Sequence, residues 1–129
     1  MVALLRRDDS QHAACLSQAS EISGRMYTSW AVITEAAWLL RRMPNGLDLL
    51  LKAIADRDFI CLELDANAAD WLIREARLYA DLLPQLADLS LVYLAHQREI
   101  EHVFTLDRRD FSVYRSKNRQ PFTLLPASF

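Results

Sequence analysis

Short apolar runs that suit buried strands alternate along this chain with longer segments of helical periodicity. The clearest run is FICLEL at residues 59–64, and further strands are predicted over 25–29, 102–106 and 121–125. Strands that are joined through helices build βαβ units and therefore a parallel sheet. The alternation predicts one α/β domain, residues 1–129, in which helices cover a central, mostly parallel sheet.

The helices between these runs have recognisable ends. They are expected over residues 9–24, 30–42, 46–55, 66–79 and 86–97. Thr28 and Ser29 are suitable N-caps for the helix that starts at residue 30. Asp65 is a suitable cap for the helix that follows the FICLEL strand.

The composition of the chain argues against several classes of protein and of binding site. The net charge of −2 gives the whole molecule no strong field that would attract nucleic acid. The only cysteines, Cys15 and Cys61, form no CxxC pair, which argues against a structural zinc site and favours a reducing cytoplasm. With two glycines, the chain contains no glycine-rich phosphate loop. No segment has the apolar length of a membrane span, and the first residues do not resemble a signal peptide.

Three acids occupy positions where a metal site could form. Glu35 and Asp88 lie near the starts of two predicted helices, and Asp107 ends the strand in VFTLDRRDF. Helix starts and strand ends meet at one edge of a parallel sheet, where open α/β folds place their ligands. Mg²⁺ and Mn²⁺ prefer carboxylate oxygens and water. The clustering predicts a metal site made of these three acids.

Each acid also has an ordinary structural interpretation. Glu35 fits a solvated acid on an amphipathic helix. Asp88 would stabilise the dipole of its helix, and Asp107 suits a turn. Asp110 is interpreted as a helix or turn cap rather than as a ligand. The metal site therefore depends on the clustering of the acids and not on any one of them.

A run of basic side chains follows Asp107. It comprises Arg108, Arg109, Arg115, Lys117 and Arg119. The run is either a solvated surface loop or a contact for a phosphate backbone beside the metal site.

The other chemically active side chains lack the spacing that catalysis requires. The three histidines show no metal-ligand spacing, and no serine has a GxSxG context. Trp30, Trp38 and Trp71 follow helical patterns and are expected in the core or in an interface. Trp30 in particular is expected on the same face as Ile33 and Leu40.

The segments that carry the three acids resemble the PIN domain family, and specifically the VapC-type toxins of bacterial toxin–antitoxin pairs. TSWAVITEAAWLLRR resembles the segment with the second family acid, which matches Glu35. YADLLPQLADLSLVYLA resembles the segment in which an Ala-Asp pair opens a helix, and its acid matches Asp88. VFTLDRRDFSVYR followed by PFTLLP resembles the C-terminal segment, whose fourth acid matches Asp107. The three segments occur in the family order and cover most of the chain.

The resemblance implies a three-layer α/β/α sandwich, PIN-like and Rossmann-like, and a metal-dependent endoribonuclease that cleaves single-stranded RNA. Glu35, Asp88 and Asp107 would then be both catalytic and metal-binding residues that hold Mg²⁺ or Mn²⁺. The candidate accessory residues are Thr28, Asp110, Arg108 and Arg109. The resemblance also implies a homodimer and an antitoxin-like protein partner that covers the site.

The chain departs from the family pattern in two places. The family opens with a strand that ends in an aspartate, and Met1 corresponds to a position just after the following turn. Asp8 and Asp9 do not replace that acid, because they match a later loop. Gln85 stands where relatives often carry another acid. Either the recorded start is too late or the protein is a degenerate member of the family.

Two other functions remain open. A degenerate, non-catalytic PIN-like protein would bind an antitoxin-like partner or itself through exposed helices, for which Trp38, Leu39 and Leu40 are suitable. An unrelated metal-dependent phosphatase or nucleotide-binding domain is disfavoured by the missing glycine loops. Metal binding would separate the ribonuclease from the degenerate protein.

Overall fold

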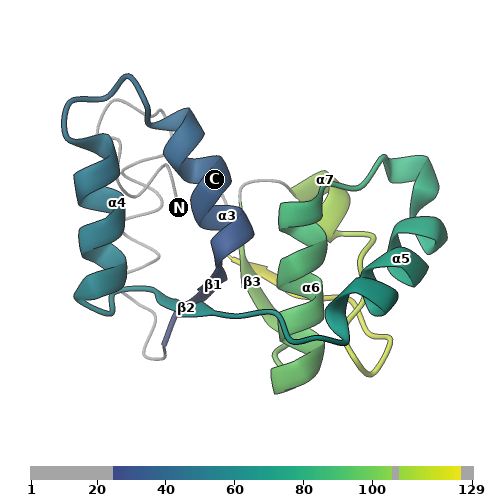
Figure 1. Ribbon diagram of the computed structural model, residues 1–129. Helices are drawn as coiled ribbons and strands as arrows, with labels where there is room; N and C mark the ends of the chain where they lie inside the picture. The colour runs from purple at the N-terminus through teal and green to yellow at the C-terminus, as the bar shows by residue number, and fades with distance from the viewer. Residues whose placement is uncertain (1–24, 106–107, 126–129) are drawn as a thin grey trace. The chain divides into compact units, whose positions relative to one another are not determined.

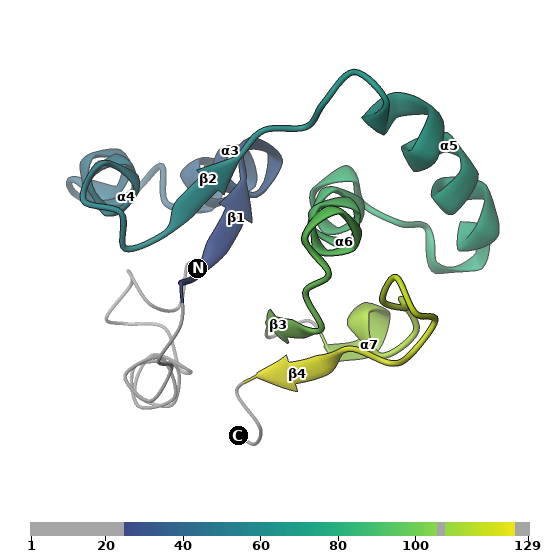
Figure 2. The ribbon, with the colours of Figure 1, turned by 90° about the horizontal axis from the view of Figure 1, so that it is seen from below.

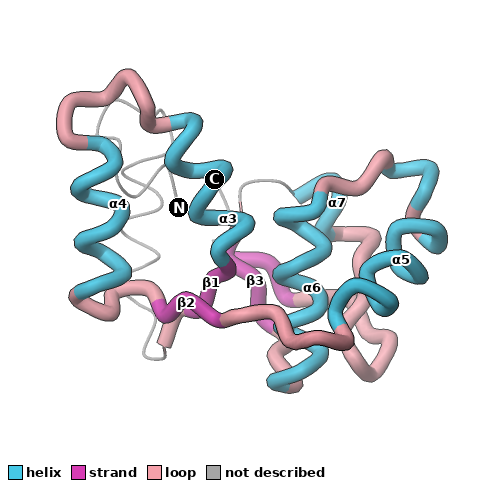
Figure 3. The backbone as a smooth tube through the Cα atoms, viewed as in Figure 1, coloured by secondary structure: helices cyan, strands magenta, loops and turns pink. Residues whose placement is uncertain are grey.

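The computed structural model describes residues 25–105 and 108–125, which form five α-helices and four short strands (Figures 1 and 3). All strand pairs are parallel, so the described chain has the predicted α/β character. The strands form two sheets of two strands each, and the three-layer sandwich around one central sheet stays a prediction. The helix expected over residues 9–24 lies outside the described residues. The chain divides into two compact units, which are described in turn.

The sheet of the first unit consists of β1 (Tyr27–Ser29) and β2 (Ile60–Leu62). Their register places Thr28 opposite Cys61. Ser29 ends β1 and caps helix α3 (Trp30–Leu39), because its side chain accepts the backbone N–H of Val32 at 3.2 Å. The cap predicted at Ser29 is therefore confirmed.

Helices α3 and α4 (Gly46–Ala55) lie side by side and antiparallel (Figures 1 and 2). Buried residues between them form a small aliphatic core, made of Ile33, Ala36, Leu40 and Leu50. The turn between the helices is tight, and a Cβ atom on Gly46 would lie 2.5 Å from the backbone oxygen of Leu40. Only glycine fits there without a shift of the backbone.

Helix α3 ends three residues earlier than predicted. The N–H groups of Arg41 and Met43 bond back by three residues, to the carbonyls of Trp38 and Leu40. This tighter pattern replaces the α-helix just before Pro44, which disfavours helical backbone in the residue that precedes it.

The second unit, within Glu63–Leu125, is built around helix α6 (Leu86–Arg98), of which seven residues are buried. Helix α5 (Ala68–Leu78) packs against α6, and a single 3-10 turn (Ala80–Leu82) joins them. Strand β3 (His102–Phe104) pairs with β4 (Thr123–Leu125), and the short helix α7 (Arg108–Phe111) lies between them in sequence.

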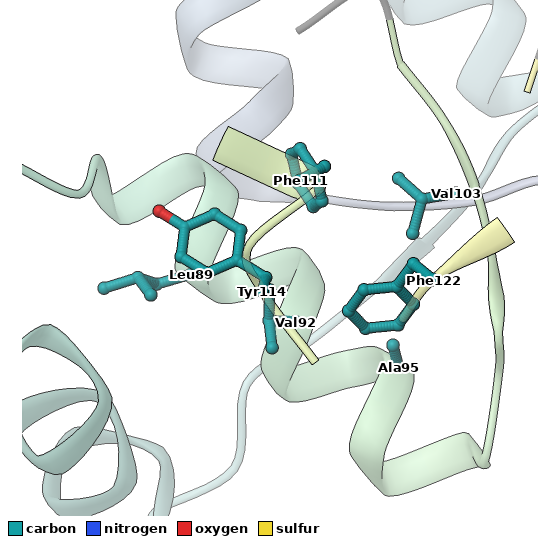
Figure 4. Close-up of a cluster of buried hydrophobic side chains, with 7 residues drawn as sticks. All are labelled: Leu89, Val92, Ala95, Val103, Phe111, Tyr114 and Phe122. Carbon is teal, nitrogen blue, oxygen red and sulfur yellow. The ribbon is translucent and has the colours of Figure 1, made fainter. Parts of the chain in front are cut away.

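The core of the second unit is rich in aromatic side chains. Figure 4 shows its buried members, which are Leu89, Val92, Ala95, Val103, Phe111, Tyr114 and Phe122. The ring of Tyr114 makes T-shaped contacts with Phe111 and Tyr79, with centroid distances of 5.3 Å and 4.9 Å. Such contacts stabilise aromatic pairs beyond the area that they bury.

Two predictions about helix faces and ends are wrong. Asp65 does not cap α5, whose N-cap is Asn67, because its carboxylate instead accepts the N–H of Asn67 at 2.9 Å. Trp30 does not lie on the buried face of α3 and is 49% exposed. Trp38 is 64% exposed, so of the core or the interface expected for it, the interface stays a prediction. The buried face of α3 is centred on Ile33, Ala36 and Leu40.

Candidate functional site

Asp88 is the predicted acid whose surroundings are defined best. It is the third residue of α6, in the first turn as predicted, between the buried residues Ala87 and Leu89. Asp88 itself is half-buried, and its Oδ2 atom is buried. The carboxylate lies at the end of α6 that carries the partial positive charge of the helix dipole.

The first turn of α6 is firmly held. Gln85 is the N-cap residue and makes no side-chain cap bond, but its carbonyl accepts the N–H of Leu89 at 3.1 Å. The hydroxyl of Ser90, which is fully buried, donates to the carbonyl of Ala87 at 2.6 Å. Asp88 therefore supplies a negative charge at the start of α6, where the cap residue Gln85 supplies none. The hydrogen bonds of this first turn hold the backbone that carries Asp88.

Glu35 lies on α3 in the first unit and is exposed. This is the environment of a solvated acid, although a metal ligand at a surface would also be accessible. Glu35 and Asp88 belong to different units, so their joint role stays a prediction. Asp107 lies outside the described residues, and its place in the metal site stays a prediction as well.

The candidate accessory residues differ in their exposure. Thr28 is buried in β1, directly before the Ser29 cap. Arg108 is half-buried and Arg109 is exposed, both in α7. Asp110 lies inside α7 and not at its N-cap, and its carbonyl accepts the N–H groups of two residues in the turn that follows.

Two members of the basic run have structural roles. Arg115 Nη1 donates to three successive carbonyls, those of Ser112, Val113 and Tyr114, at 2.7, 2.9 and 3.1 Å. Lys117 forms an exposed ion pair with Glu99 at 3.1 Å. Arg109 and Arg119 are exposed, and a contact of the basic run with a phosphate backbone stays a prediction.

A polar cluster that the sequence did not indicate joins the start of α5 to α6. The hydroxyl of Tyr93 donates to Asp65 Oδ1 at 2.5 Å, and this bond, followed by burial and the charge of Asp65, raises the pKa of Tyr93. The ring of Trp71 makes T-shaped contacts with Tyr93 and His96, both with centroids 5.2 Å apart. Asp65 and Tyr93 are 28 residues apart in the sequence, so no local spacing pattern predicts their hydrogen bond. The cluster fixes the helix that carries Asp88.

Further observations limit what can be assigned to the site. Among residues 25–105 and 108–125, no group of three His, Cys, Asp or Glu side chains is placed to hold a metal ion. None of the helices in this part of the chain has the length and apolar character needed to cross a membrane. Comparisons with protein-family models and with curated proteins find no match for the chain.

Proposed function

We propose that the protein is a Mg²⁺- or Mn²⁺-dependent endoribonuclease of the PIN-domain toxin type, which cleaves single-stranded RNA. The proposed metal-binding set is Glu35, Asp88 and Asp107. The observation that carries the proposal is the half-buried carboxylate of Asp88 in the first turn of α6, with Oδ2 buried. The parallel pairing of β1 with β2 and of β3 with β4 gives the α/β character that this function requires, and the single central sheet is part of the proposal.

The donor set fits the chemistry of a hard cation. Carboxylate oxygens are the ligands that Mg²⁺ and Mn²⁺ prefer, and a fixed carboxylate loses little freedom on binding. A bound ion would polarise the phosphate and make a bound water more acidic. Asp88 would hold one position of that ion, with Glu35 and Asp107 completing the set. Arg109, which is exposed, would contact an RNA phosphate and position the strand.

Mn²⁺ binding to the whole chain, measured by calorimetry, is the direct test. Asp88→Asn keeps the shape of the side chain and removes a charged ligand. We expect it to lower the affinity for Mn²⁺ by about a hundredfold or more, since loss of a ligand exceeds the effect of its supporting groups. Asp81→Asn, at an exposed acid in the 3-10 turn before α6, is the matched control and should bind like the wild type. Equal binding by Asp88→Asn would remove Asp88 from the site.

A chain extended by a strand that ends in aspartate, placed ahead of Met1, tests whether a fourth acid is needed. Binding by both chains means that three acids suffice, and binding by the extended chain alone means that the fourth is required. If neither binds, the ribonuclease proposal fails. For a chain that binds Mn²⁺, cleavage of single-stranded RNA but not of a small phosphate monoester separates a ribonuclease from a phosphatase.

The second candidate is a non-catalytic PIN-like protein that binds an antitoxin-like partner or itself. The exposure of Trp38 and Leu39 on α3 favours it, because large apolar side chains on a surface mark interaction sites. Leu40, which the sequence grouped with them, is buried in the core and takes no part. Association without Mn²⁺ binding would favour this candidate.

A further inference from the structure

The C-terminal end of α3 combines an exposed aromatic ring with two exposed cations, and this surface is called the α3 patch. Trp38 supplies the ring and is 64% exposed. Arg41 and Arg42 follow it within four residues, and both are exposed. Among residues 25–105 and 108–125, neither guanidinium forms an ion pair. The α3 patch is therefore locally basic, although the net charge of the chain is −2.

The guanidinium of Arg41 is held against the ring of Trp38. Its central carbon lies 3.9 Å from the ring centroid, and Nη1 donates to the carbonyl of Trp38 at 2.8 Å. This hydrogen bond uses one of the five N–H donors of the guanidinium. The contact is a cation–π pair in which a positive charge is fixed beside an aromatic surface. Because Trp38 is still 64% exposed, most of its surface remains accessible to a ligand.

We infer that the α3 patch binds single-stranded RNA, with a base stacked on Trp38 and the adjoining phosphates at Arg41 and Arg42. The inference rests on the proposed ribonuclease function and names a surface that holds its substrate. Each nucleotide of a single strand offers an aromatic base next to a negative phosphate. Proteins bind such strands through aromatic rings and neighbouring basic side chains. A duplex fits less well, because its bases are already stacked on one another.

The position of the α3 patch suits the proposed cleavage site. Glu35 precedes Trp38 by three residues, so the two side chains are neighbours on the surface of α3. Both residues are exposed. Their proximity follows from the geometry of one helix. A metal ion held by Glu35 would therefore lie next to a strand that stacks on Trp38.

The charge of the α3 patch favours RNA over a protein partner. A protein that covered the patch would bury Arg41 and Arg42 and would have to supply an acid for each, because an unpaired buried charge is costly. A phosphate backbone supplies a negative charge with every nucleotide and releases counterions when it binds. Single-stranded RNA is thus complementary both to the ring and to the cations.

RNA binding without divalent metal tests the inference separately from catalysis. The probe is a fluorescein-labelled single strand of about 12 nucleotides and mixed sequence, within the length that such sites cover. Its anisotropy is followed with the full chain in EDTA, so neither cleavage nor metal binding contributes. We expect a dissociation constant of about 10 μM at low salt, in the range of sequence-independent binding.

Substitution of Trp38 should have the largest effect on this binding. Trp38→Ala should weaken it by about tenfold, the effect of losing one stacked base. Trp38→Phe keeps an aromatic ring and should stay within about threefold of the wild type. Leu39→Ala is the matched control, because it truncates the next residue of α3, which is 50% exposed and apolar but has no ring. It should bind RNA like the wild type.

Arg42→Gln tests the phosphate contact. The dependence of log K on log salt concentration should become shallower by about 0.7, the change expected when one contact to a single-strand phosphate is lost. An unchanged salt dependence would remove Arg42 from the surface.

Three results would overturn the inference. They are no binding by the wild type at about 100 μM, unchanged binding by Trp38→Ala, and an equal loss in Leu39→Ala. Unchanged binding by Trp38→Ala would leave Trp38 and Leu39 to the protein contact of the second candidate function. Circular dichroism checks that each variant keeps its helices. If Trp38→Ala unfolds, Trp38→Leu takes its place and must show the same loss.

Mn²⁺ binding by the same variants separates this inference from the ribonuclease proposal. Trp38→Ala should bind Mn²⁺ like the wild type, because Trp38 is not a proposed ligand. Intact Mn²⁺ binding together with unchanged RNA binding by Trp38→Ala would overturn the α3 patch alone. A wild type that binds RNA through Trp38 but binds no Mn²⁺ would overturn the ribonuclease proposal alone.

Discussion

The two units of the chain differ in whether their aromatic side chains are buried or exposed. In the second unit Phe111 and Tyr114 are at most 1% exposed, and Phe122 joins them in the core. In the described part of the first unit the core is aliphatic, and Trp30 and Trp38 lie at the surface. Aromatic side chains bury about 150–250 Å² each and dominate the energetics of a core. We therefore expect the second unit to unfold with the larger free energy.

The difference gives the exposed tryptophans a physical meaning. A small aliphatic core supports little independent stability, and small units gain it from oligomers, metals or disulfides. A partner or a second copy that covers Trp38 and Leu39, as the second candidate function requires, would bury apolar surface in the unit whose described core is aliphatic. The second unit already buries several aromatic rings in its own core.

Removal of an aromatic ring from the core should destabilise the second unit and leave the first unit unchanged. Phe111→Ala is expected to lower the free energy of unfolding of this unit by about 3–5 kcal/mol, through lost transfer energy and the cavity that remains. Hydrogen exchange followed by mass spectrometry separates the units, and protection should fall within Glu63–Leu125. Leu40→Ala is the matched change in the first unit, and its loss of protection should appear in α3 and α4. Loss in the same segments for both variants would contradict the division of stability between the units.

The turn between α3 and α4 should be the most sensitive backbone position of the first unit. Gly46→Ala forces a Cβ against the Leu40 carbonyl at 2.5 Å, and we expect a loss of about 1–3 kcal/mol as the backbone shifts. Asn45→Gly, one residue earlier, relieves a positive φ of 59° and should be neutral or stabilising by up to about 1 kcal/mol. Thermal unfolding would compare them, and a neutral Gly46→Ala variant would show that the turn has room to spare.

Local patterns predicted most of the helices correctly. Residues 46–55 were expected to be helical and form α4, and residues 86–97 form α6 within one residue. These segments combine strong periodicity with clear ends, which depend on neighbours in the sequence alone. The strands were placed correctly but are shorter than expected, because the length of a strand depends on the partner with which it pairs.

Local sequence patterns did not predict which helix faces pack together or which distant residues contact each other. The face of α3 was assigned from the spacing of its apolar residues, but packing against α4 chose a face without Trp30. The bond between Asp65 and Tyr93 joins distant parts of the second unit. The positions of Glu35 and Asp88 on helices followed from the sequence, whereas their approach to one metal ion is a tertiary relation that periodicity does not determine.

The Asp65–Tyr93 bond should make the second unit sensitive to alkali. The folded-state pKa of Tyr93 is raised above its ordinary value, mainly by this hydrogen bond, so the stabilisation is complete below about pH 10 and is lost as the pH rises through the folded pKa. Tyr93→Phe should lower the free energy of unfolding at pH 8 and flatten its decrease above pH 10. Urea unfolding at pH 8 and above pH 10 measures both effects. Asp65→Asn keeps an acceptor without the charge, and a larger cost from Asp65→Asn than from Tyr93→Phe would show that the charge matters more than the bond.

The smallest effect is expected at a charged side chain that is buried in the described part of the second unit. Glu75 on α5 is 7% exposed, and its Oε2 atom makes no hydrogen bond within the described chain. Burial raises the pKa of Tyr79, one turn later, and the negative charge of Glu75 raises it further. Glu75→Gln removes the buried charge at constant shape, and we expect unfolding to become harder by roughly 0.5 kcal/mol at pH 7. Glu63→Gln, at an exposed acid, should change nothing measurable. A destabilised Glu75→Gln variant would mean that the carboxylate is paired in the folded protein, and the contrast between the units would then include a buried ion pair as well as aromatic rings.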